Sequence, residues 1–216
     1  MGDASLGGVR ERTGRKEVEM KTPTLKTGII AVGGIGALAI LYVIFSSFVS
    51  STHGPLDSYA VGTMAKFRTV PEAPDQPQNT LVTETGEELT LADMRGKIVL
   101  VNFWATWCAP CVVEMPYLDA LQGRYGSDAF EVVTISMDRR IEEPLAFFEE
   151  YELENLNFYF DPGMSIAFGV MGSANRGLPL TILYDRNGQE IGRLAGEAEW
   201  DSPEAHALIE AALERY

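Results

Sequence analysis

Cysteine and histidine are the scarcest reactive residues in this chain of 216 residues, with two of each. A structural zinc site needs four ligands, often from two Cys-x-x-Cys pairs or from added histidines, so the sequence argues against such a site. Basic residues are also few, because 17 Lys and Arg stand against 31 Asp and Glu, a net charge of −14. Nucleic-acid binding needs a basic surface, so a nucleic-acid partner is not expected.

Charge is missing altogether from one long stretch near the N-terminus, residues 28–49. As a helix this stretch would span roughly 33 Å, about the thickness of the hydrocarbon core of a bilayer. A buried core helix and a cleaved signal peptide are the alternatives. The apolar part of a signal peptide is usually ~7–15 residues long and ends at a small-x-small cleavage site. This stretch is longer and lacks a strong site of that kind, so we expect an uncleaved transmembrane anchor.

Basic residues precede the anchor, whereas the first basic residue after it is Lys66. The positive-inside rule then places residues 1–27 in the cytoplasm as an N-terminal tail. The rest of the chain would lie in the periplasm, at the inner membrane of a bacterium. Residues 50–79 are rich in Ser, Pro, Asp and Gln, which is typical of a linker with extended stretches.

Residues 80–216 carry the pattern of a folded domain. Two continuous apolar, β-rich runs, residues 97–105 and 130–138, are typical of strands buried on both faces. Helical and strand patterns alternate after them, with an Asn-Gly hairpin turn near the end and a closing amphipathic helix whose cap we expect at Ser202. This order predicts a three-layer α/β fold with a mixed central sheet.

Both cysteines lie in the stretch VNFWATWCAPCVVEMP, where a buried strand passes into a helix. A disulfide across two intervening residues closes a loop too small to stabilise the fold much. Binding of copper(I) by the two cysteines remains an alternative, because copper(I) accepts two thiolate ligands. A redox pair fits best: Cys108 would be exposed in the first helical turn, where free N–H groups favour a thiolate, and Cys111 would lie beneath it to resolve mixed disulfides. Pro110 suits a first helical turn.

The string WCAPC after a buried strand resembles the thioredoxin superfamily, and the longer string GKIVLVNFWATWCAPCVVEMP resembles its membrane-anchored TlpA/ResA branch. The resemblance covers about residues 64–216 and implies a thioredoxin-like fold. It implies that Cys108 and Cys111 are catalytic and that Pro179 is a cis-proline facing them. It also implies that Glu114 moves protons to and from Cys111, because Asn102 stands where thioredoxin has a buried Asp. Residues expected to touch the client protein are Trp107, Ala109, Pro110 and Leu178.

The family implies a periplasmic thiol-disulfide oxidoreductase, acting as a reductase, with no cofactor beyond the Cys108–Cys111 disulfide. Its electrons would come from a membrane donor of the DsbD/CcdA type. The C-terminal tail is similar to that of alphaproteobacterial TlpA, which implies clients with copper-site cysteines: a Sco-type copper chaperone or subunit II of cytochrome oxidase. Two alternatives remain: a ResA/CcmG-like reductase of apocytochrome c, although RGLPLT replaces the GVYGVPE-like loop usual there, and a non-catalytic copper(I) chaperone.

Overall fold

The computed structural model describes residues 54–70, 74–171 and 177–216. The chain divides into two units, Met1–Ser50 and Ser51–Tyr216, and the second contains every described residue. The predicted tail (1–27) and anchor (28–49) lie outside the described residues. Within the described ranges no helix has the length and apolar character needed to cross a bilayer.

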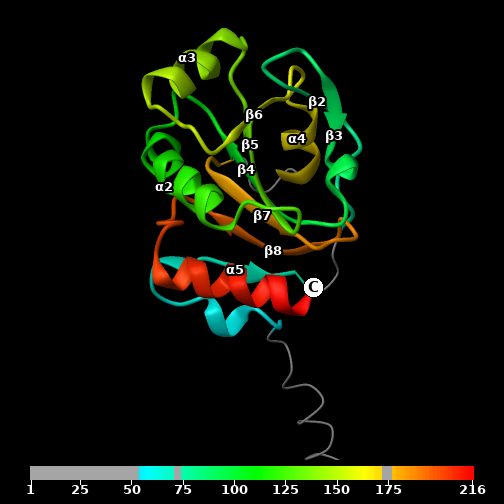
Figure 1. Cartoon of the computed structure of the whole chain (residues 1–216), viewed down its shortest axis with the longest axis vertical. Helices are drawn as coiled ribbons and strands as arrows, with labels where there is room; N and C mark the ends of the chain where they lie inside the picture. The colour runs from blue at the N-terminus through cyan, green and yellow to red at the C-terminus, as the bar shows by residue number, and fades with distance from the viewer. Residues whose placement is uncertain (1–53, 71–73, 172–176) are drawn as a thin grey trace, which may run out of the picture. The chain divides into compact units, whose positions relative to one another are not determined.

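A mixed eight-stranded sheet forms the centre of the second unit, in the order β1-β8-β7-β4-β5-β6-β2-β3 (Figure 1). Its middle strands, β4 and β5, pair in parallel and are buried at every position, as the two apolar runs predicted. The α/β fold with a mixed sheet is therefore confirmed. The strands are β1 (Arg68–Thr69), β2 (Thr80–Val82), β3 (Glu88–Thr90), β4 (Ile98–Trp104), β5 (Phe130–Ser136), β6 (Asn157–Phe160), β7 (Leu180–Tyr184) and β8 (Glu190–Ala195).

Four α-helices pack against this sheet: α2 (Ala109–Tyr125), α3 (Glu142–Glu150), α4 (Ser165–Met171) and α5 (Pro203–Arg215). In Figure 1, α2 and α3 lie to one side of strands β4–β6 and α4 to the other. Asn102 and Trp104 lie two residues apart in β4, so their side chains point to the same face of the sheet. Asn102 contacts α2, and Trp104 contacts α3. The C-terminal helix α5 meets α2, where the Tyr125 hydroxyl donates to Glu210 at 2.8 Å.

The predicted turn and cap residues behave as expected. The β7–β8 hairpin turns through Asn187 and Gly188, and Gly188 has a φ of 81°, which a side chain would disfavour. The Ser202 hydroxyl accepts a hydrogen bond from the Ala205 N–H at 3.2 Å and caps α5. Local sequence was sufficient at both positions because each interaction spans fewer than five residues.

The expected linker at residues 50–79 is wrong for its described part. Leu56, Met64 and Phe67 are buried in the core, in a segment with two short 3₁₀ helices, η1 (Asp57–Tyr59) and η2 (Gly62–Met64). Strand β1 then pairs with β8 and covers what would otherwise be an open edge. The Ser-, Pro-, Asp- and Gln-rich composition of residues 50–79 indicated a linker and hid the packing of these three apolar residues. The folded domain therefore includes residues from 54 onward.

Candidate active site

The two cysteines lie at the C-terminal end of β4, where the chain enters α2. Cys108 is the N-cap of α2, and a disulfide joins it to Cys111 with 5.3 Å between the Cα atoms. The expectation that Cys108 is exposed is wrong for this oxidised state, because its exposure is 7 % and that of Cys111 is zero. The disulfide holds the Cys108 sulfur close to the first turn of α2. Cys108 is still the more accessible partner, so an incoming sulfur meets it first.

Trp107, the residue before Cys108, borders a groove that is lined mostly by apolar side chains. Trp107 is 69 % exposed, and the Leu178–Pro179 peptide bond is cis, as the resemblance implied. Trp107 and Leu178 lie on a shared groove of about 580 Å³. The groove is lined by Trp107, Met137, Arg139, Glu143, Met164, Phe168 and Leu178. We refer to it below as the client groove.

Five of these lining residues were missed by the sequence reasoning. Met137 and Arg139 directly follow β5, the parallel neighbour of β4, and the C-terminal ends of parallel strands meet at one edge. That rule could have identified them. Met164 directly precedes α4 and Phe168 lies in its first turn, and no local sequence pattern marks either residue. Ala109 and Pro110, expected at the client surface, are exposed and half-buried but do not line the groove.

Glu114 lies on α2, three residues after Cys111, and both side chains have no exposed surface. Its Oε1 accepts a hydrogen bond from Asn102 Nδ2 at 2.6 Å. Its Oε2 accepts from the Ala198 N–H at 3.1 Å and from Trp200 Nε1 at 3.3 Å. Burial raises the pKa of Glu114 to about 7, because the three donors offset only part of the cost of desolvating the carboxylate. A carboxyl with such a pKa can take and return a proton near neutrality.

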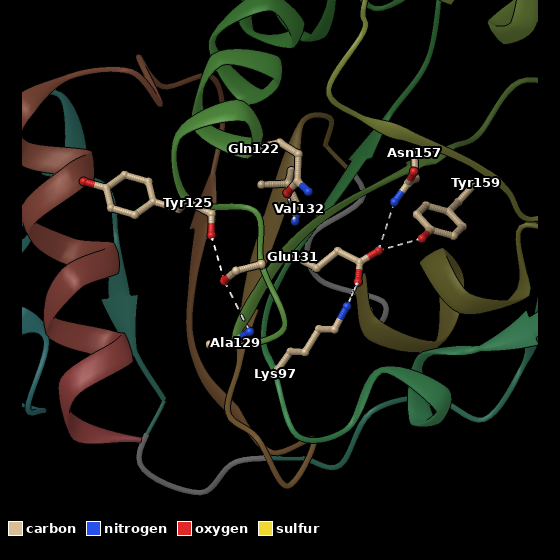
Figure 2. A network of polar contacts seen from close by, with 9 residues as sticks. Lys97, Gln122, Tyr125, Ala129, Glu131, Val132, Asn157 and Tyr159 are labelled. Carbon is tan, nitrogen blue, oxygen red and sulfur yellow. Dashed lines mark hydrogen bonds and ion pairs between the residues drawn. The ribbon is translucent and has the colours of Figure 1, made fainter.

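Glu131 shows what a buried carboxyl looks like when it is structural (Figure 2). It lies at the start of β5, at the opposite end of the strands from the disulfide, and accepts from Lys97 Nζ at 2.8 Å and from the Tyr159 hydroxyl at 2.7 Å. Burial acts to raise the pKa of Glu131, but the hydrogen bonds from Lys97 and Tyr159 and the Lys97 charge outweigh it and lower the pKa. Glu131 therefore stays ionised, unlike Glu114.

Asp138 supports the loop before the cysteines and was also missed. Its carboxylate is buried and accepts from the Thr106 hydroxyl at 2.8 Å, from the Thr106 N–H and from Ser136. These contacts fix the backbone two residues before Cys108. The parallel pairing of β4 with β5 could have identified Asp138, because Asp138 follows β5 as Thr106 follows β4.

The arrangement supports disulfide exchange. A Cys108 thiolate attacks a client disulfide and releases one client thiolate, and Cys111 then attacks Cys108 and releases the second. The two electrons of the thiol pair pass to the other protein in this direction and return in the reverse direction. Within the described residues, no group of three His, Cys, Asp or Glu side chains is arranged to hold a metal ion.

Comparisons with known proteins agree with this chemistry. Residues 72–191 match the family described as the AhpC/TSA family. A thiol-disulfide oxidoreductase ResA of Bacillus cereus is 31 % identical over 121 residues, which cover 55 % of this chain and 67 % of ResA. ResA of Geobacillus kaustophilus is 28 % identical over 193 residues, 89 % of this chain and 95 % of the relative.

Solved structures extend the likeness to the fold. A putative thiol:disulfide interchange protein DsbE from Chlorobium tepidum superposes with a TM-score of 0.58 at 28 % identity, covering 67 % of this chain and 99 % of that one. These relatives support a thiol-disulfide oxidoreductase rather than a non-catalytic copper(I) chaperone. The chain belongs to the AhpC/TSA family, with a thioredoxin-like fold, and is a thiol-disulfide oxidoreductase of the ResA type.

Proposed function

We propose that this protein is a membrane-anchored reductase of the bacterial periplasm that reduces the cysteine pair of a dedicated client protein. The uncharged stretch 28–49 and the basic residues before it support the anchor and its orientation. Electrons would reach Cys108 and Cys111 from a membrane donor of the DsbD/CcdA type.

The observation that carries the proposal is the client groove beside the disulfide. Its apolar side chains, above all Trp107 and Phe168 at 69 % and 53 % exposure, suit an apolar segment of a protein next to the reacting cysteine. A small charged disulfide such as that of glutathione has no apolar side chain to fill it. Arg139 and Glu143 supply one charge of each sign at the groove.

Among protein clients, copper-site cysteines are the ones we propose, in a Sco-type copper chaperone or in subunit II of cytochrome oxidase. The C-terminal tail, similar to that of TlpA, supports this choice. The loop at the cis-proline supports it as well, because Leu180 follows Pro179 and is buried in β7. A reductase of apocytochrome c usually carries a Glu at that point, and this chain offers none.

A trapping experiment tests the client. The Cys111→Ala variant keeps the attacking thiol but cannot resolve the mixed disulfide, so it should accumulate covalently bound client in the native membrane. Mass spectrometry of the complex should identify a copper chaperone or oxidase subunit II. The matched control is the double variant Cys108→Ala/Cys111→Ala, which should trap nothing. Apocytochrome c in the trapped complex would replace the copper-site proposal with cytochrome maturation.

A redox titration tests the direction of electron flow. We expect the full-length protein, equilibrated with glutathione buffers, to have a reduction potential below about −200 mV. A value near about −120 mV, typical of a strong oxidant, would make the protein an oxidase of client thiols.

A further inference from the structure

Within the described residues, every hydrogen-bond partner of the Glu114 carboxyl group is a donor. Asn102 Nδ2 points at Oε1, and the Ala198 N–H and the Trp200 indole point at Oε2. This shell matches a carboxylate, which only accepts hydrogen bonds. The protonated acid has an O–H that needs an acceptor, and none of the three contacting groups offers one as oriented. Because the pKa of Glu114 is about 7, both forms are populated near neutral pH.

An unused acceptor lies on one of the three donors. Asn102 Oδ1 is buried and has no hydrogen-bond partner, while Asn102 Nδ2 contacts both Glu114 Oε1 at 2.6 Å and Thr181 Oγ1 at 2.9 Å. A half-turn of the carboxamide about its terminal bond exchanges the nitrogen and the oxygen. The carbonyl would then accept from the Glu114 O–H and from the Thr181 hydroxyl, which serves equally as acceptor or donor.

We propose that Asn102 is a proton-coupled positioning residue, whose carboxamide donates to the Glu114 carboxylate and turns over to accept from the Glu114 acid. During client reduction, the Cys111 thiol gives its proton to Glu114, and the resulting thiolate attacks the Cys108 sulfur of the mixed disulfide. The Cys108–Cys111 bond forms, the client sulfur leaves as a thiolate, and the proton held by Glu114 is returned to thiol or solvent. When the Asn102 carboxamide has rotated, its oxygen accepts a hydrogen bond from the protonated Glu114. Neither side chain is exposed, so water cannot take the place of this acceptor. The inference rests on the exchange reaction and not on the identity of the client.

Few other ionisable groups face Glu114 in the described part of the chain. Glu197 lies two residues after β8, and its charge contributes to raising the pKa of Glu114. Glu197 is itself paired with Lys66 at 3.6 Å. Cys108 and Cys111 on α2 titrate only when reduced. From α5, His206 pairs with Asp201 at 3.0 Å, directly beside Trp200. The groups from β4 and β7, Asn102 and Thr181, are neutral.

Nuclear magnetic resonance on the oxidised full-length protein tests the turn without any client. Between pH 5 and pH 9 the Trp200 indole N–H should titrate with a midpoint near 7, with Trp104 and Trp107 as internal references. On the basic side an Asn102 side-chain N–H should show an Overhauser contact to Thr181, and this contact should vanish on the acidic side. Persistence of the contact at both ends would overturn the proposal. The Glu114→Gln variant has no carboxyl group to titrate at this site and is the control, in which the midpoint near 7 should be absent.

Substitution of Asn102 tests whether this residue hydrogen-bonds to both protonation states of Glu114 or only donates to the carboxylate. If Asn102 served only the carboxylate, Asn102→Leu would raise the Trp200 midpoint by about one to two pH units. A group that serves both forms should leave the midpoint within about half a unit, while proton transfer slows and turnover falls about tenfold. A rise of the midpoint by a full unit or more, or unchanged turnover, would refute the two-way role.

Discussion

Glu114 and Glu131 are both buried glutamates, and the residues around them decide their different chemistry. Lys97 lies 2.8 Å from Glu131 and keeps it ionised. The hydrogen-bond partners of Glu114 are neutral, so desolvation dominates and its pKa rises to about 7. Among the described residues, the buried glutamate with the raised pKa is thus the one without a cation as hydrogen-bond partner.

This difference predicts how stability depends on pH. The folded protein holds the Glu114 proton up to a pKa of about 7, whereas the unfolded chain releases it near 4.5. The folded state thus binds more protons between these values, and stability falls as pH rises through this window. The contribution of Glu114 amounts to about 3 kcal/mol, fully present below pH 4.5 and lost above pH 7.

Urea unfolding of the oxidised protein at a series of pH values measures this contribution. The Glu114→Gln variant has no proton to lose, so the difference in unfolding free energy between parent and variant should fall by about 3 kcal/mol across the window. Two stability curves that run parallel from about pH 4.5 to about pH 8 would show that Glu114 titrates normally in the folded state.

At the scale of elements, helix α4 and the residue before it supply two side chains of the client groove. This helix of seven residues brings Phe168 to the surface beside the disulfide, with 53 % of the side chain exposed. Met164, just before it, has a φ of 51°, an uncommon conformation for a residue with a side chain. An exposed aromatic residue and a strained backbone in the same groove favour a role in binding over a role in stability.

The Phe168→Ser variant tests this role. Its unfolding free energy should change by no more than about 0.5 kcal/mol because the side chain is largely exposed. The kcat/KM for reduction of the client protein that trapping identifies should fall about tenfold. The kcat/KM for a small aromatic disulfide should not change. Val61→Ser is the matched control, since Val61 is 52 % exposed and does not line the groove. Equal losses for client and small disulfide would place the effect at the cysteines instead.

Elements marked by a local sequence pattern were predictable, and side-chain contacts between distant positions were not. Strands β4 and β5, the capped helix α5 and the β7–β8 hairpin follow from apolar runs, a Ser-Pro start and an Asn-Gly turn. At the site, the motif predicted the Cys108–Cys111 pair and the cis bond before Pro179, and the catalytic role of Glu114 stays a prediction. No sequence motif marks Trp200, yet its indole donates to Glu114 across 86 positions of sequence. Neither this contact nor the one between Asn102 and Thr181 leaves a trace in local periodicity.

At the scale of the whole molecule, the segment before the first predicted strand completes the domain. Phe67 is 1 % exposed and packs over Gly192 of β8, where an added methyl group would lie 2.2 Å from the end of the ring. The Thr63 and Ser202 hydroxyls lie 2.8 Å apart and join this segment to the cap of α5. Residues 54–70 are thus held by the core, by an edge strand and by the last helix.

A double-mutant cycle tests whether this segment is integral to the fold. Phe67→Ala should lower the unfolding free energy by about 3–5 kcal/mol, because it removes a buried ring. Gly192→Ala should cost about 1–3 kcal/mol, because the new methyl group meets that ring. In the Phe67→Ala background the same Gly192→Ala change should cost much less, since the ring is gone and the methyl group fills part of the cavity. The two changes should therefore couple by at least about 1 kcal/mol in urea unfolding of the full-length protein. Strict additivity would mean that the segment does not pack on β8, and the domain would then begin near residue 80 as the sequence first indicated.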